Sequence, residues 1–516
     1  MKKLLLFMLI TVFSFGLLSC RSNKDSNYDG TIVVGLECNY APFNWAETKE
    51  TESNVPINGK SNLYAEGYDI QIAKRIAEDL NYKLVIEMID WDGLIPALES
   101  NKIDLIIAGM SPTEERKQTI NFTDAYYQSD HVLVLKKTSS YVQATTFADL
   151  SGAKVMGQKS TIYDDLAKQI SEKNKNVIYQ TPLDSVSDIL ISMDSNATDI
   201  TVLEKPVAEG IIAAHPEYTY ISLVTPFDVA TEDIVVSIGV RKSDVTLLTK
   251  VNESLSKISE FERNDLMSRA VEMQTGTTEK MTIITIVTEY ATLFLQGIGI
   301  TLLLAIVGTI AGLLIALIFG YIRVQTIHPY DSKFTKIFKK TINFIVKIYV
   351  TVFRGTPMIL QAFIFYYGFL HLGINWSALA AGIFTVSLNT GAYLTEVIRG
   401  GISSVDKGQL EAARALGMSE TKAMLLIIYP QALKNSMASI GNELIVNIKD
   451  TAVLSTIGII DLFNATTTIT GATYLYLEAY SIGAIIYLIL TYTSSKLLMY
   501  FEKRIGAPVK EITSSN

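Results

Sequence analysis

Hydrophobic and polar positions follow two different patterns, which divide the chain near residue 280. In residues 26–280 polar and apolar positions are mixed, and short apolar runs alternate with stretches of helical periodicity. This pattern predicts strands at residues 31–35, 82–87 and 103–108, and helices at residues 67–80 and 91–99. Because strands alternate with helices, we expect an α/β sheet with crossover connections. Such sheets bind ligands beyond the carboxyl ends of their strands, which makes residues 108–116 a candidate binding loop.

From residue 281 onward the chain is dominated by long apolar stretches, which predict an all-α membrane domain. A helix needs about 20 residues to cross a bilayer. We expect five spans, at residues 293–322, 355–372, 377–397, 434–462 and 477–500. The fourth contains Glu443, Lys449 and Asp450. Ionisable groups at that depth are costly, so this span is expected to face protein or a polar path.

The first 25 residues have the pattern of a secretory signal. Two lysines follow Met1, an apolar run extends over residues 4–18, and a polar stretch comes after Cys20. Residues 17–20, Leu-Leu-Ser-Cys, resemble the site at which a bacterial lipoprotein is lipidated on its cysteine. Lipidation of Cys20, an ordinary cleaved signal and a retained anchor all remain open, and each sends the following domain outside the cell.

Basic residues in the predicted loops give the orientation of the spans. Lys and Arg are frequent between spans one and two, between spans three and four, and in the tail, but absent from residues 371–376 and 463–476. The positive-inside rule therefore places the C-terminus in the cytoplasm. With an odd number of spans, the domain before them lies outside the cell, as the signal also requires.

Composition excludes several functions. A formal net charge of -8 argues against nucleic-acid binding, and two cysteines and four histidines argue against a disulfide framework or a metal site. Residues 152–160 approach the phosphate-binding pattern Gly-x4-Gly-Lys-Ser, but Gln158 separates the second glycine from the lysine. We therefore expect no ATPase, and no bound cofactor, in this chain.

Several motifs of the first half occur in the order found in one protein family. They include Tyr40-Ala-Pro-Phe43, Gly67-Tyr-Asp69, Trp91-Asp-Gly-Leu-Ile-Pro-Ala-Leu98, Glu115-Arg116 and Phe122-Thr-Asp-Ala-Tyr-Tyr127. Over residues 30–275 the chain resembles the polar amino-acid-binding proteins of ATP-driven (ABC) importers. The resemblance implies two α/β lobes that close on the ligand, with lobe one at residues 30–137 and 233–275 and lobe two at residues 138–232.

The resemblance assigns roles to residues that suit a free amino acid. An arginine fork with added donors holds a carboxylate best, which points to Arg116 with Ser111 and the backbone of Gly109. Glu204 is the expected partner of the ammonium, although the family usually has Asp there. The remaining candidates are the aromatic walls and the lobe-two loop, at Tyr40, Trp91, Gln158, Ser160 and Thr161.

Glu37 occupies the position that faces the ligand side chain. An acid between two aromatic residues suits a cationic end, and aromatic faces add cation–π attraction. This favours lysine, arginine or histidine as the substrate, while glutamine or another neutral polar amino acid stays open.

Over residues 290–505 the chain resembles the permeases of polar amino-acid importers, joined to the first half by a linker at residues 276–289. The motif Glu411-Ala412-Ala413 followed by Gly417 matches the segment that docks on the ATPase. The resemblance implies ATP on a separate ATPase subunit, a homodimer, and a multi-pass protein of the cell membrane in a bacterium of the Gram-positive type. Glu443 is expected either to neutralise a passing cationic substrate or to pair with Lys449.

We therefore expect the binding and permease subunit of an amino-acid importer rather than an enzyme. A ligand-gated channel and a dehydratase with a similar two-lobed domain are the alternatives. In such channels the spans interrupt the two-lobed domain, whereas here that domain is expected to finish before residue 281, and a dehydratase would not explain the segment at Glu411.

Overall fold

The computed structural model describes residues 28–128, 130–183, 185–224, 227–228, 235–278, 281–327, 329–374 and 376–505. The predicted signal and Cys20 lie outside these residues. The chain falls into two compact units. One comprises the first half up to Leu295 together with Asn464–Gly483, and the other comprises Gln296–Phe463 and the chain from Ala484 onward.

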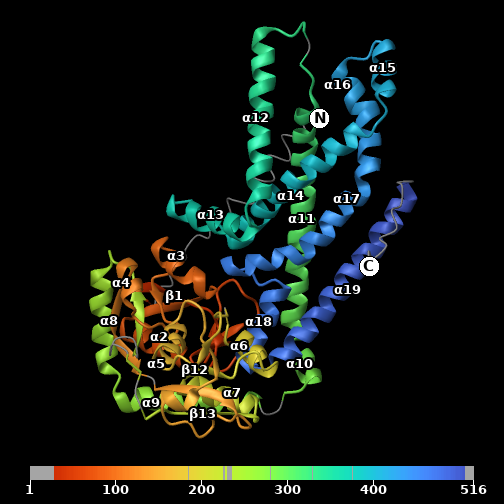
Figure 1. Ribbon diagram of the computed structural model, residues 1–516. Coiled ribbons are helices and arrows are strands. Elements are labelled where there is room, and N and C mark those ends of the chain that lie inside the picture. Colours follow the sequence, from red (N-terminus) through yellow and green to blue (C-terminus); the bar gives the residue numbers. More distant parts are fainter. Residues whose placement is uncertain are drawn as a thin grey trace. The chain divides into compact units, whose positions relative to one another are not determined.

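The first lobe is built on a mixed five-stranded sheet (Figure 1). Its order is β6 (Tyr82–Met88), β1 (Gly30–Leu36), β7 (Leu105–Ile106), β14 (Val235–Val240) and β8 (Asn121–Gln128). β1 pairs in parallel with β6 and β7, whereas β14 runs antiparallel to β7 and β8. A second, small sheet contains β2 (Asn39–Tyr40), β3 (Asn44–Glu47), β5 (Tyr64–Glu66) and β4 (Val55–Pro56).

The second lobe has its own five-stranded sheet. Its order is β11 (Ile178–Tyr179), β10 (Lys154–Met156), β12 (Ile200–Glu204), β9 (His131–Lys136) and β13 (Tyr218–Ile221). This corrects the expected boundary after residue 137, because β9 pairs with β12 and β13 rather than with the first sheet. The chain therefore passes from the first sheet to the second between β8, which ends at Gln128, and β9, which begins at His131. The two strands are close in the sequence and have the same strand-like pattern, so the pattern does not show that they belong to different sheets.

Helices of the predicted kind connect these strands. The expected helix at 67–80 is α2 (Tyr68–Asp79), and its apolar residues Ile70, Ile72, Ala73 and Ile76 are buried. The expected helix at 91–99 is a 3-10 turn, η1 (Trp91–Gly93), followed by α3 (Leu94–Glu99). The other connecting helices are α4 (Glu114–Thr119), η2 (Phe147–Leu150), α5 (Ile162–Lys173), α6 (Val186–Asp194) and α7 (Lys205–Ala214). Three helices follow the last strand, namely α8 (Val245–Lys257), α9 (Glu260–Thr278) and α10 (Ile283–Glu289).

The C-terminal half is helical. Its elements are α11 (Ala291–Val324), α12 (Lys333–Gly355), α13 (Met358–His371), α14 (Ala378–Ser403), α15 (Lys407–Ala415), α16 (Glu420–Ala423), the π-helical turn η3 (Met424–Ile428), α17 (Tyr429–Asp450), η4 (Thr451–Ile457), α18 (Leu462–Thr473) and α19 (Tyr476–Ile505). Among the described residues three helices are long and apolar enough to cross a membrane, or up to five if each bent pair counts as one span.

Two of the predicted spans differ from the structure. The loop expected between the first two spans is largely helix α12, which is joined to α13 at a bend of 108°. Its lysines interrupt the apolar positions, so a search for uncharged stretches does not detect it. The expected span at 434–462 is α17 followed by the short helix η4, which ends at Gly458 in the left-handed conformation.

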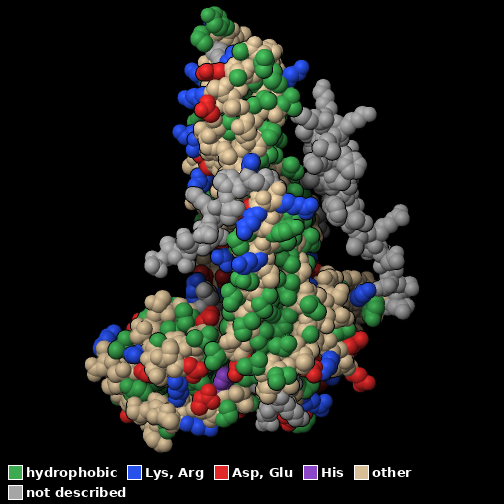
Figure 2. Space-filling view, turned by 90° about the vertical axis from the view of Figure 1, so that its right-hand side faces the viewer, with side chains coloured by type: hydrophobic (Ala, Val, Ile, Leu, Met, Phe, Trp, Pro, Cys, Tyr) green, Lys and Arg blue, Asp and Glu red, His purple; other side chains and the backbone are tan. Residues whose placement is uncertain are grey.

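Close contact between α11 and α14 depends on two glycines. A Cβ atom on Gly308 would lie 2.3 Å from Val386 Cγ1, and one on Gly312 would lie 2.9 Å from the backbone nitrogen of Gly391. The four-residue spacing of these glycines on one helix face allows the backbones to approach. Apolar side chains also remain exposed on the helices of the C-terminal half, including Leu488, Ile489 and Tyr492 of α19. Figure 2 shows an apolar band with few charged side chains.

Candidate functional site

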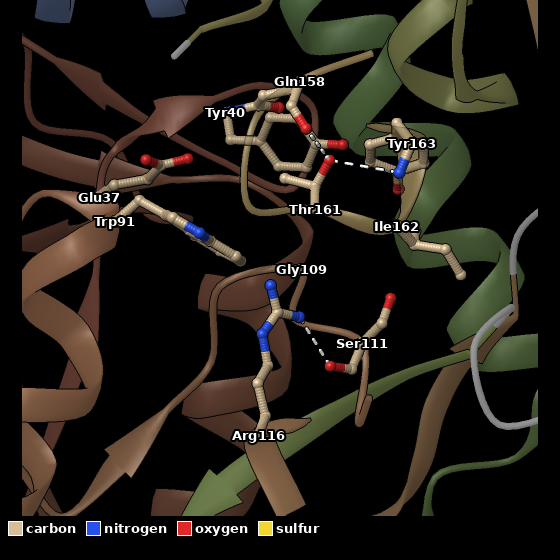
Figure 3. A pocket seen from close by; sticks show the side chains of 10 residues that line it. All are labelled: Glu37, Tyr40, Trp91, Gly109, Ser111, Arg116, Gln158, Thr161, Ile162 and Tyr163. Atoms are coloured by element: carbon tan, nitrogen blue, oxygen red, sulfur yellow. Dashed lines mark hydrogen bonds between the residues drawn. The ribbon is translucent and has the colours of Figure 1, made fainter. Parts of the chain in front are cut away.

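A pocket lies between the two lobes and is lined by residues from both (Figure 3). Eight of its ten residues are among the ten predicted from the sequence, and the other two are Ile162 and Tyr163. The lining residues are Glu37, Tyr40, Trp91, Gly109, Ser111, Arg116, Gln158, Thr161, Ile162 and Tyr163. Motifs that are far apart in the sequence are therefore brought to one site.

Arg116 is held in place by both lobes. It lies in α4, whose N-cap Thr113 accepts a hydrogen bond from the Arg116 backbone nitrogen. The guanidinium donates to the carbonyl of Ser111 at 2.8 Å and, across the pocket, to the carbonyl of Ser160 at 2.9 Å. Its Cζ lies 5.1 Å from the centre of the Trp91 ring. The guanidinium is thus fixed with its planar donor fork at the pocket.

Gly109 permits a close approach of the backbone to the pocket. Its φ of +63° is a conformation that side chains disfavour, and a Cβ atom there would lie 3.2 Å from the ring of Tyr40. Its N–H donates to the hydroxyl of Tyr126 at 3.2 Å, and that hydroxyl donates to Asp69 at 2.7 Å. The Gly109 N–H, which we expected to face the ligand, is therefore used inside lobe one.

Glu37 follows strand β1 and is only 9% exposed. The Asn39 side-chain amide is assigned with its nitrogen towards Glu37. In this orientation the Asn39 nitrogen donates to both carboxylate oxygens of Glu37, at 3.1 and 3.0 Å. Burial, and then the nearby carboxylates of Asp90, Asp92 and Asp69, raise the pKa of Glu37 to about 8. A cation at this end of the pocket would relieve the repulsion among these acids.

Glu204 ends strand β12, directly before α7 with Pro206 in its first turn, as the sequence indicated. It is 1% exposed and lies behind the lining residues rather than among them. The Tyr40 hydroxyl donates to its Oε2 at 2.7 Å, and the Tyr163 hydroxyl also hydrogen-bonds to it. Burial raises the pKa of Glu204 to about 7, and the two hydroxyls oppose that shift.

The lobe-two loop ends in the N-cap of α5. Thr161 caps this helix by accepting from the Tyr163 backbone nitrogen, and its own hydroxyl donates to the carbonyl of Gln158 at 2.6 Å. Ser160 has a φ of +59° and lines the neighbouring opening rather than the pocket itself. The loop therefore presents its backbone, more than its hydroxyls, to Arg116.

The groups that support the lining residues were not predicted from the sequence. Asn39 and the acids at positions 90 and 92 flank predicted residues, and their polar character beside an expected pocket was a usable signal. Tyr163 lies two residues after the capping threonine at the start of α5, and none of the motifs identified in the sequence includes it.

Comparison with known proteins gives independent support. Residues 32–269 match the bacterial extracellular solute-binding proteins, family 3, and residues 334–506 match the inner membrane component of binding-protein-dependent transport systems. The arginine transport system permease protein ArtQ of Bacillus subtilis (strain 168) is 36% identical over 223 residues, which are 43% of this chain and 93% of that protein. The chain belongs to the amino-acid ABC importers. It joins a binding component and a permease component in one polypeptide.

Two further relatives belong to the same class. The arginine-binding extracellular protein ArtP of Bacillus subtilis (strain 168) is 30% identical over 263 residues, 50% of this chain and 94% of that protein. A putative glutamine transport system permease protein, GlnP, of Rickettsia bellii (strain RML369-C) is 36% identical over 211 residues, 41% of this chain and 91% of that protein. The relatives are all transporter components, but two are named for arginine and one for glutamine.

In the permease component, the predicted ATPase-docking segment forms helix α15. Asp406 caps it by accepting from the Gly408 backbone nitrogen at 2.7 Å, and Gly417 follows its end with a φ of +83°. Glu411 and Ala412 are exposed, whereas Ala413 is buried. Leu416, at the end of the helix, is 84% exposed, so this segment offers an apolar side chain to a partner.

Glu443 lies half-buried on α17, and Lys449 lies exposed on the same helix. Six residues along a helix correspond to about 600°, which places the two side chains on different faces. Among the described residues no ion pair joins them. The arrangement therefore does not support the expectation that Glu443 is paired with Lys449.

Proposed function

We propose that this chain is the binding and permease subunit of an importer for cationic L-amino acids. In this proposal the first half binds lysine, arginine or histidine outside the cell, and a separate ATPase drives a homodimer of the second half. The observation that carries the choice of substrate is the buried Glu37 among other carboxylates at one end of the pocket.

The two constant groups of an amino acid have suitable partners. The Arg116 guanidinium can take the carboxylate, since its fork matches the two oxygens and it already lies at the pocket. Glu204 can take the ammonium through its buried carboxylate. Figure 3 shows Tyr40 and Tyr163, which donate to Glu204, on the opposite side of the pocket from Arg116.

The side-chain end supports a cation. In Figure 3 Trp91 lies between Arg116 and Glu37, so a side chain that starts near the arginine runs along the indole towards the acid. A guanidinium or ammonium there would gain the Glu37 carboxylate and the face of Trp91. Burial and then neighbouring acids raise the pKa of Glu37, and a positive ligand offsets the repulsion from those acids, which a neutral ligand does not.

Glutamine is the second candidate, because several relatives are named as putative glutamine transport system permease proteins. With a pKa of about 8, Glu37 carries its proton at neutral pH in the empty pocket. A protonated carboxyl can donate to a side-chain amide oxygen and accept from its nitrogen. The two substrates therefore make different demands on the same residue.

Calorimetric titration of the purified full-length chain with each of the twenty L-amino acids tests the proposal. We expect the tightest binding for arginine or lysine, and a loss of at least tenfold in Glu37→Gln, in line with a lost charge-assisted bond of about 1.5–3 kcal/mol. Glu78→Gln, an exposed acid of α2, is the matched control and should bind normally. Tight binding of glutamine alone would refute the cationic substrate and keep the importer.

The remaining parts of the proposal concern transport by the permease component and its ATPase. Reconstituted with its ATPase, the chain should couple ATP hydrolysis to uptake, with the segment around Glu411 on the ATPase and Glu443 on the substrate path. Glu443→Gln should slow uptake of arginine more than it weakens arginine binding. Reaction of a cysteine placed at exposed Lys175 with a membrane-impermeant reagent on intact cells tests whether the binding domain lies outside.

A further inference from the structure

Two side-chain hydrogen bonds at the pocket join the lobes, one from Tyr40 to Glu204 and one between the hydroxyls of Tyr40 and Tyr163. Tyr40 belongs to the small sheet of lobe one, and Glu204 ends a strand of the lobe-two sheet. Their contact, at 2.7 Å, bridges positions 164 residues apart. A further bond across the pocket runs from the Arg116 side chain to the backbone carbonyl of Ser160.

Glu204 is shielded from the pocket by its two tyrosine partners. It is 1% exposed, and Tyr40 and Tyr163 line the pocket in front of it. A buried carboxylate is costly unless donors surround it, so these two hydroxyls stabilise it while the pocket is empty. They differ in one respect, because Tyr163 shares the lobe of Glu204 and Tyr40 does not.

We propose that the Tyr40 hydroxyl occupies, in the empty pocket, the place that the ligand ammonium takes at Glu204. The inference rests on the proposed function. An ammonium brings a full positive charge and three donors, so it adds the attraction of an ion pair to the single hydrogen bond that the hydroxyl gives the carboxylate. A bound amino acid therefore displaces the hydroxyl and restores the partner that Glu204 loses.

This arrangement has two opposite effects. In the empty protein the Tyr40 hydroxyl holds the lobes together across the pocket. When a ligand binds, the same bond must break, so the hydroxyl lowers the affinity that the pocket would otherwise have. The ring of Tyr40 keeps its separate role as a wall, stacked on Phe43 at 5.5 Å between centroids.

The matched pair Tyr40→Phe and Tyr163→Phe separates these effects, because each removes one hydroxyl from the same carboxylate. The full-length chain is used, with fluorescent labels on cysteines at exposed Glu99 and Lys175, one in each lobe, and with Cys20→Ser so that Cys20 takes no label. Energy transfer between the labels reports lobe closure without ligand. Calorimetry of the unlabelled variants gives the affinity for arginine.

Tyr40→Phe should lower energy transfer in the empty protein and tighten arginine binding by up to about ten- to a hundredfold, the value of one hydrogen bond to a charged group. Tyr163→Phe should lower energy transfer less than Tyr40→Phe, because the Tyr40–Glu204 bond stays. It should weaken arginine binding, because Glu204 loses a partner that stays in the complex. Unchanged energy transfer in Tyr40→Phe, or weaker binding by it, would overturn the inference. Failure of the proposed function would look different, because the parent chain would then bind none of the amino acids. Energy transfer without ligand would still show whether the Tyr40 hydroxyl joins the lobes.

Discussion

Binding of a cationic amino acid should release a proton from Glu37. The pKa of this carboxyl in the empty pocket is raised to about 8, first by burial and then by Asp90, Asp92 and Asp69. A guanidinium beside it stabilises the ionised form and lowers that pKa again. Below pH 8 the proton must therefore leave before the ion pair forms, and affinity for a cation rises with pH.

The size of the effect follows from the fraction of Glu37 that is ionised in the empty protein. With a pKa of about 8, the affinity should rise about ninefold from pH 6 to 7, about fivefold from pH 7 to 8, and about twofold from pH 8 to 9. Glu204 also titrates in this range, so the pH dependence of one ligand alone would mix two groups.

The ratio of affinities for arginine and citrulline isolates Glu37, because citrulline has nearly the same shape but carries a neutral urea group in place of the guanidinium. Calorimetry in buffers of different ionisation enthalpy should show about 0.9 proton released at pH 7 for arginine, and a smaller release for citrulline. Both effects should vanish in Glu37→Gln. A ratio that stays constant from pH 6 to 8 would refute the assignment of Glu37 to the cationic end.

The same pKa shift fixes the sign of the pH effect on stability. Because the folded empty domain holds the Glu37 proton more tightly than the unfolded chain, it loses stability as pH rises from about 4.5 to about 8. The upper limit of this loss is about 5 kcal/mol. Glu37→Gln should therefore raise the unfolding midpoint of the empty binding domain at pH 8 and change it little at pH 4.

Three further predictions test other parts of the molecule. Arg116→Lys keeps the charge but removes the fork, so arginine should bind about ten- to a hundredfold more weakly, while its decarboxylated amine should bind as before, both by calorimetry. Gly109→Ala should destabilise the binding domain by about 1–2 kcal/mol in denaturant unfolding, because of its left-handed φ, whereas Gly276→Ala, with nothing within 4 Å of the new methyl, should not. Leu416→Asp should reduce ligand-stimulated ATP hydrolysis by the assembled importer without changing the affinity for arginine, and Ile327→Asp, at an exposed residue in the loop before α12, should leave hydrolysis unchanged.

The fold could be predicted wherever one local pattern decides the structure. The strand at β1 and the helix α2 show the periodicity of their elements, and α11 has a mean hydropathy of 2.9 in its most apolar window, which only a span explains. α12 was not predicted from its hydropathy, because its lysines lie on the same helix as a buried face at Val346 and Val350. The position of the lobe boundary was predicted wrongly for a different reason. The sheet that β9 joins depends on β12 and β13, which are far away in the sequence.

The site shows the same division between local and distant causes. Residues carried by a recognisable motif, such as Arg116 and Trp91, could be assigned from the sequence, because a motif preserves its own local geometry. The sequence also nominated Glu204, but not that Tyr40 and Tyr163 would cover it, because that contact exists only when two lobes meet. A motif gives the type of group at each position, whereas the partner that occupies it in the empty protein is set by the fold. Substitutions such as Tyr40→Phe are therefore more informative about how this pocket works than further substitutions within the motifs.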